Sequence, residues 1–493
     1  MLGTVNDLIW TPMAYFALAV GLFFTIATRA VQFRLLPEMV KQIFAKPLHS
    51  EGVAPIQALL LTLASRVGVG NIAGVGTAVA AGGPGALFWM VVVALLGSSA
   101  AFAETVLAQV FKRRIDGEDR GGAPFYIQFG LGLRWLAVVF AVLYMVIYGF
   151  LTPGVQANNI ASATENAFSI PSWVTAIVLT AILGFTIIGG TKRIITAAQV
   201  MVPVMALGYI LFAFSLIVLN VDQVVPSITL VLESAFGRDQ VFGGIAGAAI
   251  AWGVRRAVFS NVAGVGEGTF GSAAASVSHP AKQGLVQAFS IFIDTCVVCL
   301  ATGIMIVITK SYNVFDGDRA LVEYMPDVEA GVGFTQAAVN TVIAGFGPAF
   351  IAIALFFFAF TSMVAFYYIA ETNLVFIRGK NGGWPTWVLK IGAMVITAFG
   401  SVVSADIMWS LGDIGYGTLG WFNMIAILLL SPVVVKVIRD FDRQRKASLD
   451  PIFEPGTLGI DNAGWWSNIH RQVEHGEQPQ ETMEPAEKRR LNL

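Results

Sequence analysis

The chain has few charged residues. Only 12% of its 493 residues are Asp, Glu, Lys or Arg, whereas roughly 25% is usual for soluble domains. Hydrophobic residues make up 56% and the mean hydropathy is +0.73. The formal net charge is −1, so there is no basic excess to hold a nucleic acid. This composition excludes an ordinary soluble domain and predicts an integral membrane protein embedded in a lipid bilayer.

Cysteine and histidine are also scarce. The two cysteines, Cys296 and Cys299, lie in one apolar segment, so a disulfide framework is excluded and both are expected to act as small apolar side chains. No HExxH or Walker-type sequence is present. We therefore expect neither an enzyme nor a bound cofactor. The four histidines, all expected in loops or in the C-terminal tail, are His49, His279, His470 and His475.

Long apolar runs fill most of the chain. Each is long enough to cross about 30 Å of hydrocarbon as a helix, and the first lacks the flanks of a cleaved signal peptide, so we expect it to be retained. The sequence thus predicts an all-α fold with eleven transmembrane helices. The expected spans are 8–31, 54–80, 85–111, 134–165, 172–190, 197–219, 240–266, 283–309, 337–373, 384–404 and 416–437.

The charges between the spans alternate. Connections that follow odd-numbered spans, together with the C-terminal tail, hold nearly all loop lysines and arginines. Connections that follow even-numbered spans hold only Arg238, Lys310 and Arg319. Since cytoplasmic loops carry the basic residues, we expect the N-terminus outside and the C-terminus in the cytoplasm, as in a multi-pass protein of a plasma membrane of the bacterial inner-membrane type.

Two glycine-rich stretches interrupt spans 2 and 7: residues 64–74 (ASRVGVGNIAG) and 260–268 (SNVAGVGEG). Each helical glycine costs about 1 kcal/mol relative to alanine, and lipid cannot satisfy freed backbone groups. Such breaks are tolerated beside an internal cavity, and a matched pair is typical of secondary transporters. The alternative is that the glycines only let helices pack closely.

The two broken helices divide the spans into two sets of five. Spans 2–6 and 7–11 have opposite orientations because five is odd, which predicts a 5+5 inverted repeat with a binding site between the breaks. We expect a peripheral first helix and loop in residues 1–50, a core in 51–440 with repeats at about 51–220 and 238–440, and a loosely ordered cytoplasmic tail in 441–493.

Several sequence blocks resemble the alanine or glycine:cation symporter family, also known as sodium:alanine symporters. They are spread in order through most of residues 50–435. The resemblance implies the leucine-transporter-type fold and import of a small neutral, zwitterionic amino acid with Na⁺. The blocks are residues 64–84, 83–90 (GPGALFWM), 121–127 (GGAPFYI), 259–266 (FSNVAGVG), 279–285 (HPAKQGL) and 357–373.

Candidate substrate-binding residues surround the breaks. Unwound backbone offers N–H groups to a carboxylate and carbonyl groups to an ammonium or a cation. Asn71 and Asn261 either bind the cargo or cap the helix that restarts after each break. The full set is Gly68, Val69, Gly70, Asn71, Gln156, Phe259, Ser260, Asn261, Gly264, Ser362 and Phe366.

The resemblance also implies a Na⁺ site between the first break and span 9. Its ligands would be the carbonyl groups of Ala64, Val67 and Phe358 and the hydroxyl groups of Thr361 and Ser362, since a hard cation prefers several oxygen ligands. The alternative is ordinary hydrogen bonding of both hydroxyls to their own helix. Proton coupling and an ion channel are the other functions to be weighed.

Charged residues inside the spans are functional or structural candidates, because charges are costly in a membrane. Sequence alone does not pair them. The chain departs from the family pattern at Val69, Val262 and Phe366, and it carries an acid at Glu267. These departures bear on which substrate the site accepts. The charged candidates are Arg66, Glu104, Arg255, Arg256, Glu267, Asp294 and Glu371.

Overall fold

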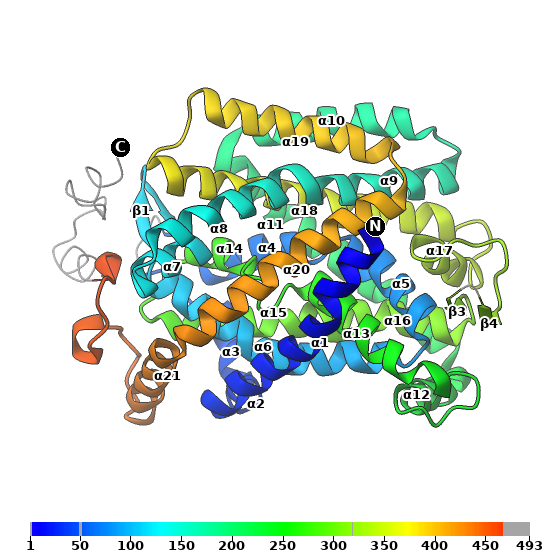
Figure 1. Ribbon diagram of the computed structural model, residues 1–493, viewed down its shortest axis with the longest axis horizontal. Coiled ribbons are helices and arrows are strands. Elements are labelled where there is room, and N and C mark those ends of the chain that lie inside the picture. Colours follow the sequence, from blue (N-terminus) through cyan, green and yellow to red (C-terminus); the bar gives the residue numbers. More distant parts are fainter. Residues whose placement is uncertain (1, 49–51, 318, 467–493) are drawn as a thin grey trace.

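The computed structural model describes residues 2–48, 52–317 and 319–466, and helices dominate it (Figure 1). Within these residues, seven helical segments are apolar and long enough to cross a membrane, and two bent helix pairs raise the number to nine. The seven are α1 (Leu2–Ala27), α6 (Ala86–Val110), Arg134–Phe168, Arg193–Leu219 within α11 (Gly190–Leu219), Pro280–Ile308, α18 (Gly347–Arg378) and α19 (Trp384–Val402).

Two expected spans form helices that are shorter than a full crossing. The fifth corresponds to α10 (Ser172–Ile188), with 17 residues, and the seventh to α13 (Ala246–Asn261), with 16 residues. The count of eleven spans and the inverted repeat therefore remain predictions. The segment Arg134–Phe168 consists of α8 (Arg134–Val146), η2 (Ile147–Leu151) and α9 (Thr152–Phe168). The segment Pro280–Ile308 consists of α15 (Pro280–Ile291), η4 (Phe292–Cys299) and α16 (Leu300–Ile308).

The expected bounds of spans 9 and 11 were wrong. Span 9 is split into α17 (Val332–Asn340) and α18, because Gly345 adopts φ +77° and Pro348 starts a new helix. Span 11 lies earlier, in α20 (Ala405–Leu429), and a turn at Leu430 leads into α21 (Ser431–Lys446) at 60°. Pro432 lacks an N–H group and occupies the first turn of α21.

The expectation of a loosely ordered tail from residue 441 was also wrong for the residues that the structure describes. Helix α21 continues to Lys446, and the chain beyond it packs onto the protein as far as Trp466. Phe453, Trp465 and Trp466 are buried, so aromatic anchors hold a segment that is otherwise polar. Residues 467–493 of the predicted tail, including His470 and His475, lie outside the described residues, as does His49.

The remaining elements are short. Two antiparallel hairpins, β1–β2 and β3–β4, lie in the connections. The other elements are α2 (Val31–Arg34), α3 (Leu36–Ile43), α4 (Pro55–Arg66), η1 (Gly70–Gly74), α5 (Val75–Gly82), β1 (Arg113–Ile115), β2 (Glu118–Arg120), α7 (Ala123–Leu131), α12 (Val221–Ala235), η3 (Gly243–Ile245), α14 (Gly268–Ala273), β3 (Asn313–Asp316), β4 (Arg319–Glu323) and η5 (Pro455–Leu458).

Helix α18 runs through the centre of the bundle. Every residue from 358 to 376 is buried, because α4, α8, α9, α11 and α17 pack around it. Helices α10 and α19 pack together along one edge, and α1 lies against α6 and α20 (Figure 1). A helix that is apolar on all sides belongs in such a core, so the hydroxyl groups of α18 point into protein rather than lipid.

Candidate functional site

The first break lies between α4 and η1. Helix α4 ends at Arg66, and the chain resumes as η1 at Gly70, so that the two helical parts of this pair are bent by 57°. The freed Gly68 N–H donates to Asn71 Oδ1 over 2.9 Å, and the Val69 N–H donates to Gln156 Oε1 over 3.1 Å. Amide oxygens thus occupy two backbone donors that could instead hold a carboxylate.

The second break lies between α13 and α14. Val262, Gly264 and Gly266 all have positive φ angles, of 48°, 81° and 88°. A β-branched residue is strained in this region, by about 1–3 kcal/mol, so Val262 carries a conformational cost at the break. The Gly264 carbonyl accepts from Asn423 Nδ2 over 2.9 Å, and the Gly266 N–H donates to Glu104 Oε2 over 3.1 Å.

The two breaks meet at Asp294. This carboxylate, in η4, is fully buried. Its Oδ1 accepts from Asn71 Nδ2 over 2.7 Å and its Oδ2 from Ser260 Oγ over 3.0 Å and Thr295 Oγ1 over 2.8 Å. Because Asn71 follows the first break and Ser260 precedes the second, Asp294 joins both broken helices at one negative charge.

Gly68 and Gly70 allow this close approach. A Cβ atom built on Gly70 would lie 3.0 Å from Ser260 Cα, and one built on Gly68 would lie 2.5 Å from Ser362 Oγ and 3.1 Å from Gln156 Oε1. Either glycine could be replaced only if its neighbours moved. The glycines therefore serve both close packing and the proposed site. Their close packing creates the contact region where Asn71 and Ser260 meet the Asp294 carboxylate, which we call the junction.

Aromatic rings cover the other side of the junction. The Phe259 and Tyr416 rings are 4.8 Å apart between centroids, Tyr416 and Tyr148 are 5.8 Å apart, and Tyr148 and Phe366 are 5.3 Å apart. The Trp409 ring lies tilted against the Phe259 ring, with 5.0 Å between the centroids. The wall is continuous and apolar, as expected for the lining of a small-molecule site with few polar groups.

The structure brings most of the predicted substrate-binding residues to this junction and leaves two of them aside. Asn261 donates to Thr295 Oγ1 over 3.1 Å and accepts from the backbone N–H of Ala263 within the break. It does not cap the helix that restarts after the break, because α14 begins at Gly268 and has no side-chain cap. Gly264 packs on Met424. Those at the junction are Gly68, Val69, Gly70, Asn71, Gln156, Phe259, Ser260, Ser362 and Phe366.

The predicted Na⁺ ligands of α18 form a compact group. Thr361 Oγ1 and Ser362 Oγ each donate to the Phe358 carbonyl over 3.0 Å, which is the helix back-bonding that the alternative described. Helix α4, which holds Ala64, packs against α18. A cation bound here would compete with these hydrogen bonds for the hydroxyl and carbonyl oxygens.

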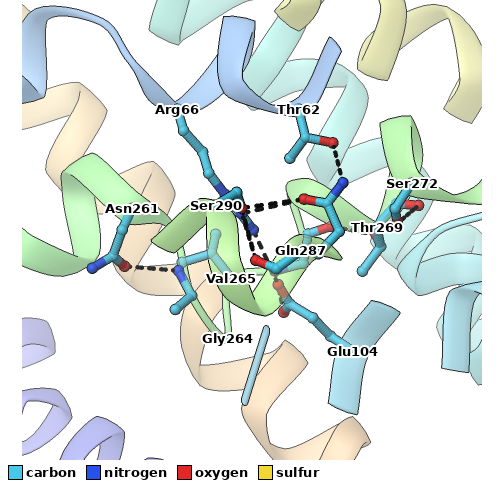
Figure 2. A network of polar contacts seen from close by, with 12 residues as sticks. Thr62, Arg66, Glu104, Asn261, Gly264, Val265, Thr269, Ser272, Gln287 and Ser290 are labelled. Atoms are coloured by element: carbon cyan, nitrogen blue, oxygen red, sulfur yellow. Dashed lines mark hydrogen bonds and ion pairs between the residues drawn. The ribbon is translucent and has the colours of Figure 1, made fainter. Parts of the chain in front are cut away.

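Five of the seven candidate charges inside the spans take part in three ion-paired groups. Arg66 Nη2 lies 3.9 Å from Glu104 Oε1, and the same guanidinium reaches Ser290 and Gln287 of α15 (Figure 2). Arg255 and Arg256 both bind Asp413, at 2.7 and 2.9 Å. The third group joins Glu371 to Arg120 at 3.8 Å. Asp294 is therefore bonded to neutral side chains rather than to an arginine.

Sequence reasoning missed several residues of the junction. The sequence indicated only that Asp294 is an acidic residue inside a predicted span. Nothing in a single sequence placed it beside Asn71. Tyr148, Tyr416 and Asp413 gave no signal beyond an aromatic or acidic residue in an apolar run. Their positions depend on contacts between helices far apart in the chain, which periodicity does not report.

The sequence matches the model of the sodium:alanine symporter family over residues 1–455. It is 45% identical over 442 residues to the sodium/proton-dependent alanine carrier protein of Bacillus sp. (strain PS3), covering 88% of this chain and 98% of that protein. It is 42% identical over 473 residues to the amino-acid carrier protein AlsT of Bacillus subtilis (strain 168), covering 95% and 97%. It is 34% identical over 455 residues to the sodium/alanine symporter AgcS of Methanococcus maripaludis, covering 90% and 98%.

Proposed function

Because this chain belongs to the sodium:alanine symporter family, we propose that it imports a small neutral amino acid, alanine or glycine in type, together with Na⁺ by alternating access. Membership of a transport family and several apolar helices make it a multi-pass membrane carrier rather than an enzyme. The fold we propose retains the eleven spans and the inverted repeat, with α4–α5 and α13–α14 as the broken helices.

The observation that carries the proposal is the junction at Asp294. Two broken helices, a buried carboxylate and two backbone N–H groups lie together beneath an aromatic wall. The N–H groups of Gly68 and Val69 hold the carboxylate of the amino acid once the amides of Asn71 and Gln156 release them. The Asp294 carboxylate balances one positive charge of the cargo.

The aromatic wall limits the cargo to a small side chain. The rings of Phe259, Phe366 and Tyr148 are buried. Tyr148 packs against Phe366, and Tyr416 lies between Tyr148 and Phe259. A large substrate side chain would therefore have to displace at least one ring. Since interiors are packed as densely as organic crystals, uptake should fall steeply as the side chain grows beyond that of alanine. Phe366 is one ring of this wall and would help to set the size limit in this chain.

Na⁺ is the coupling ion of this proposal, held by the carbonyl groups of Ala64, Val67 and Phe358 and by the hydroxyl groups of Thr361 and Ser362. Cargo and ion then stabilise the same arrangement of the first break, so that each raises the affinity for the other. Proton coupling is the second candidate, because the relative from Bacillus sp. (strain PS3) is a sodium/proton-dependent alanine carrier protein by name.

Uptake by proteoliposomes tests both parts of the proposal. The purified protein should concentrate alanine under an inward Na⁺ gradient, and Thr361→Ala should lower the stimulation by Na⁺ at least tenfold, about 1.4 kcal/mol. Thr397→Ala is the matched control, because the Thr397 hydroxyl donates over 2.8 Å to a carbonyl of its own helix, that of Ala393, as the Thr361 hydroxyl does to that of Phe358, but Thr397 lies on α19. An unchanged Na⁺ response in Thr361→Ala would refute the ion site. Absence of Na⁺-driven uptake for every small neutral amino acid would refute the function.

A further inference from the structure

A basic cleft lies where α1 ends. It has a volume of about 270 Å³ and is formed by residues 27–29 at the end of α1 and by one face of α21. About 20 residues cross the hydrocarbon layer of a membrane, and α1 has 26, so its end and the cleft lie at the level of the lipid headgroups. Four basic side chains and one acidic side chain line it: Arg29, Arg439, Arg443, Lys446 and Asp442.

The charges of this cleft do not balance. Asp442 is already bound by Arg34 of α2, over 2.8 Å, so that α2 and α21 lie side by side (Figure 1). Arg443 bonds to Asp440 on its own helix. The remaining basic side chains are exposed and form no ion pair within the part of the chain that the structure describes: Arg29, Arg439 and Lys446. Three positive charges therefore face one cleft without a carboxylate to balance them, and such a cleft fits an anion.

A neighbouring cleft shows that this excess of positive charge is local. It is larger, about 690 Å³, and lies between α3 and residues 448–451. Its charged side chains mostly pair with one another: Lys282 with Asp450, and Arg445 with Glu38 over 3.6 Å. Lys41 also lies 4.0 Å from Glu38. Internal pairing leaves little charge there for a ligand, whereas the cleft at the end of α1 keeps its positive charge free.

Exposed apolar side chains adjoin the basic cleft on both sides of the turn after α1. Phe23 and Ile26 are 43% and 70% exposed. They share one face of α1 with Ala27, which lines the cleft, because residues three and four apart lie together on a helix. Beyond the turn, Phe33 of α2 and Phe44 after α3 are 53% and 73% exposed. Large apolar groups next to a basic cleft match an amphiphile with an anionic headgroup rather than a soluble anion.

We propose that this cleft binds the phosphate group of an anionic phospholipid, in the leaflet that is predicted to be cytoplasmic. Arg29 approaches the phosphate from the end of α1, and Arg439 and Lys446 approach it from α21. Guanidinium groups bind phosphate oxygens through parallel N–H donors, and basic groups beside a membrane-spanning helix attract anionic lipid. The acyl chains lie along Phe23 and Ile26, so the bound lipid bridges α1 and α21. This inference does not depend on the cargo or on the coupling ion.

Lipid binding to the purified full chain in detergent tests the site. Native mass spectrometry measures the dissociation constant of the first bound lipid. The probes are dioleoyl-phosphatidylglycerol, which is anionic, and dioleoyl-phosphatidylcholine, which has the same acyl chains and no net charge. Wild type should bind the anionic lipid more tightly by about tenfold or more, since each basic group near the headgroup attracts it. Arg29→Gln/Arg439→Gln should reduce this preference to about twofold or less and leave the binding of phosphatidylcholine unchanged.

The matched control is Arg238→Gln/Arg319→Gln. Both of these arginines are exposed and neither lines the cleft, so the control removes the same charge elsewhere and should bind both lipids as wild type does. Amide hydrogen exchange then locates the effect. Residues 436–446 of α21 should exchange about threefold more slowly in nanodiscs of phosphatidylglycerol than in nanodiscs of phosphatidylcholine. The difference should vanish in Arg29→Gln/Arg439→Gln.

Any of three results would overturn the proposal: equal affinity of wild type for the two lipids, a wild-type preference in Arg29→Gln/Arg439→Gln, or equal exchange of α21 in both kinds of nanodisc. Glycerol 3-phosphate tests a soluble source of the phosphate group and should not raise the unfolding temperature of wild type. A rise that Arg29→Gln/Arg439→Gln abolishes would assign the cleft to a soluble phosphate and overturn the lipid. If the double variant does not fold, Lys446→Gln, at the exposed end of α21, permits the same comparison with a smaller expected loss of preference.

Discussion

Asp294 illustrates how one side chain can define a site. Its two oxygens hold Asn71 from one broken helix and Ser260 from the other, so removal of its charge alters both halves of the junction at once. A buried carboxylate that forms no ion pair is retained only at a cost. Each hydrogen bond that it accepts here comes from a neutral group, which leaves its charge available to a cation.

We expect Asp294→Asn to lower alanine uptake at least tenfold, equivalent to about 1.4 kcal/mol. The amide has nearly the volume of the carboxyl group, so the protein should fold, but it cannot balance a positive charge. The measurement is the rate of Na⁺-driven uptake at equal protein density in proteoliposomes. Asp316→Asn, at an exposed end of β3, is the control. Wild-type uptake by Asp294→Asn would show that this charge has no part in transport.

At the scale of residues, sequence reasoning identified the groups that flank a break more readily than their partners. Gly68, Gly70 and Ser260 were predictable because glycine density marks the breaks and a break frees backbone groups. Asn261 was placed in the site by analogy with Asn71, yet Val262 adopts a left-handed conformation immediately after it. The Asn261 side chain then turns to Thr295. A local backbone angle of this kind is not readable from hydropathy.

The broken helices are elements whose function depends on close contact. Gly70 of η1 lies against the backbone of Ser260 at the end of α13, so the distance between the two breaks is set by the absence of a side chain. A wider separation would pull Asn71 and Ser260 off the Asp294 carboxylate. The junction is therefore a property of the pair of elements and not of either helix alone.

Gly70→Ala should abolish most uptake while leaving the fold intact. The added Cβ would lie 3.0 Å from Ser260 Cα, and backbone on the far side cannot rotate away as a side chain can. We expect at least a tenfold fall in the rate of Na⁺-driven alanine uptake. Gly208→Ala is the matched control, since Gly208 lies within α11 and a Cβ there would meet nothing within 4 Å. It should leave uptake unchanged, and equal rates for the two variants would contradict the close-contact argument.

Element bounds were predictable where one apolar run is one helix. The limits expected for spans 3 and 10 lie close to α6 and α19, because polar or proline-containing turns flank both. The predicted bounds of span 9 were wrong because residues 337–346 are largely apolar, although the chain turns at Gly345. The predicted bounds of span 11 were wrong because α20 begins earlier, in polar sequence at Ala405. Hydropathy reports what a helix touches, whereas its ends depend on turn geometry.

The whole molecule is closed at one face by its C-terminal segment, residues 447–466. The Phe453 N–H donates to the Ser278 carbonyl over 2.9 Å, and Trp466 Nε1 donates to the Gln109 carbonyl over 2.8 Å. Trp465 lies under Lys112, whose Nζ is 3.7 Å from the ring centroid. Gln109 and Lys112 belong to the first predicted repeat and Ser278 to the second, so the segment spans both on the face predicted to be cytoplasmic.

Trp465→Ala should release this segment without unfolding the bundle. Replacing a buried tryptophan by alanine costs about 3–5 kcal/mol, and the loss falls on a segment that α18 and its neighbours do not need for their own packing. Amide hydrogen exchange should therefore accelerate at least tenfold in residues 453–466 and stay unchanged in residues 358–376 of α18. Trp384→Ala, which removes a tryptophan that is 77% exposed, should change neither region. Unaltered exchange in residues 453–466 of Trp465→Ala would mean that the hydrogen bonds to the Ser278 and Gln109 carbonyl groups hold the segment by themselves. Acceleration throughout α18 would instead make the segment a part of the cooperative core, with the two predicted repeats joined through it.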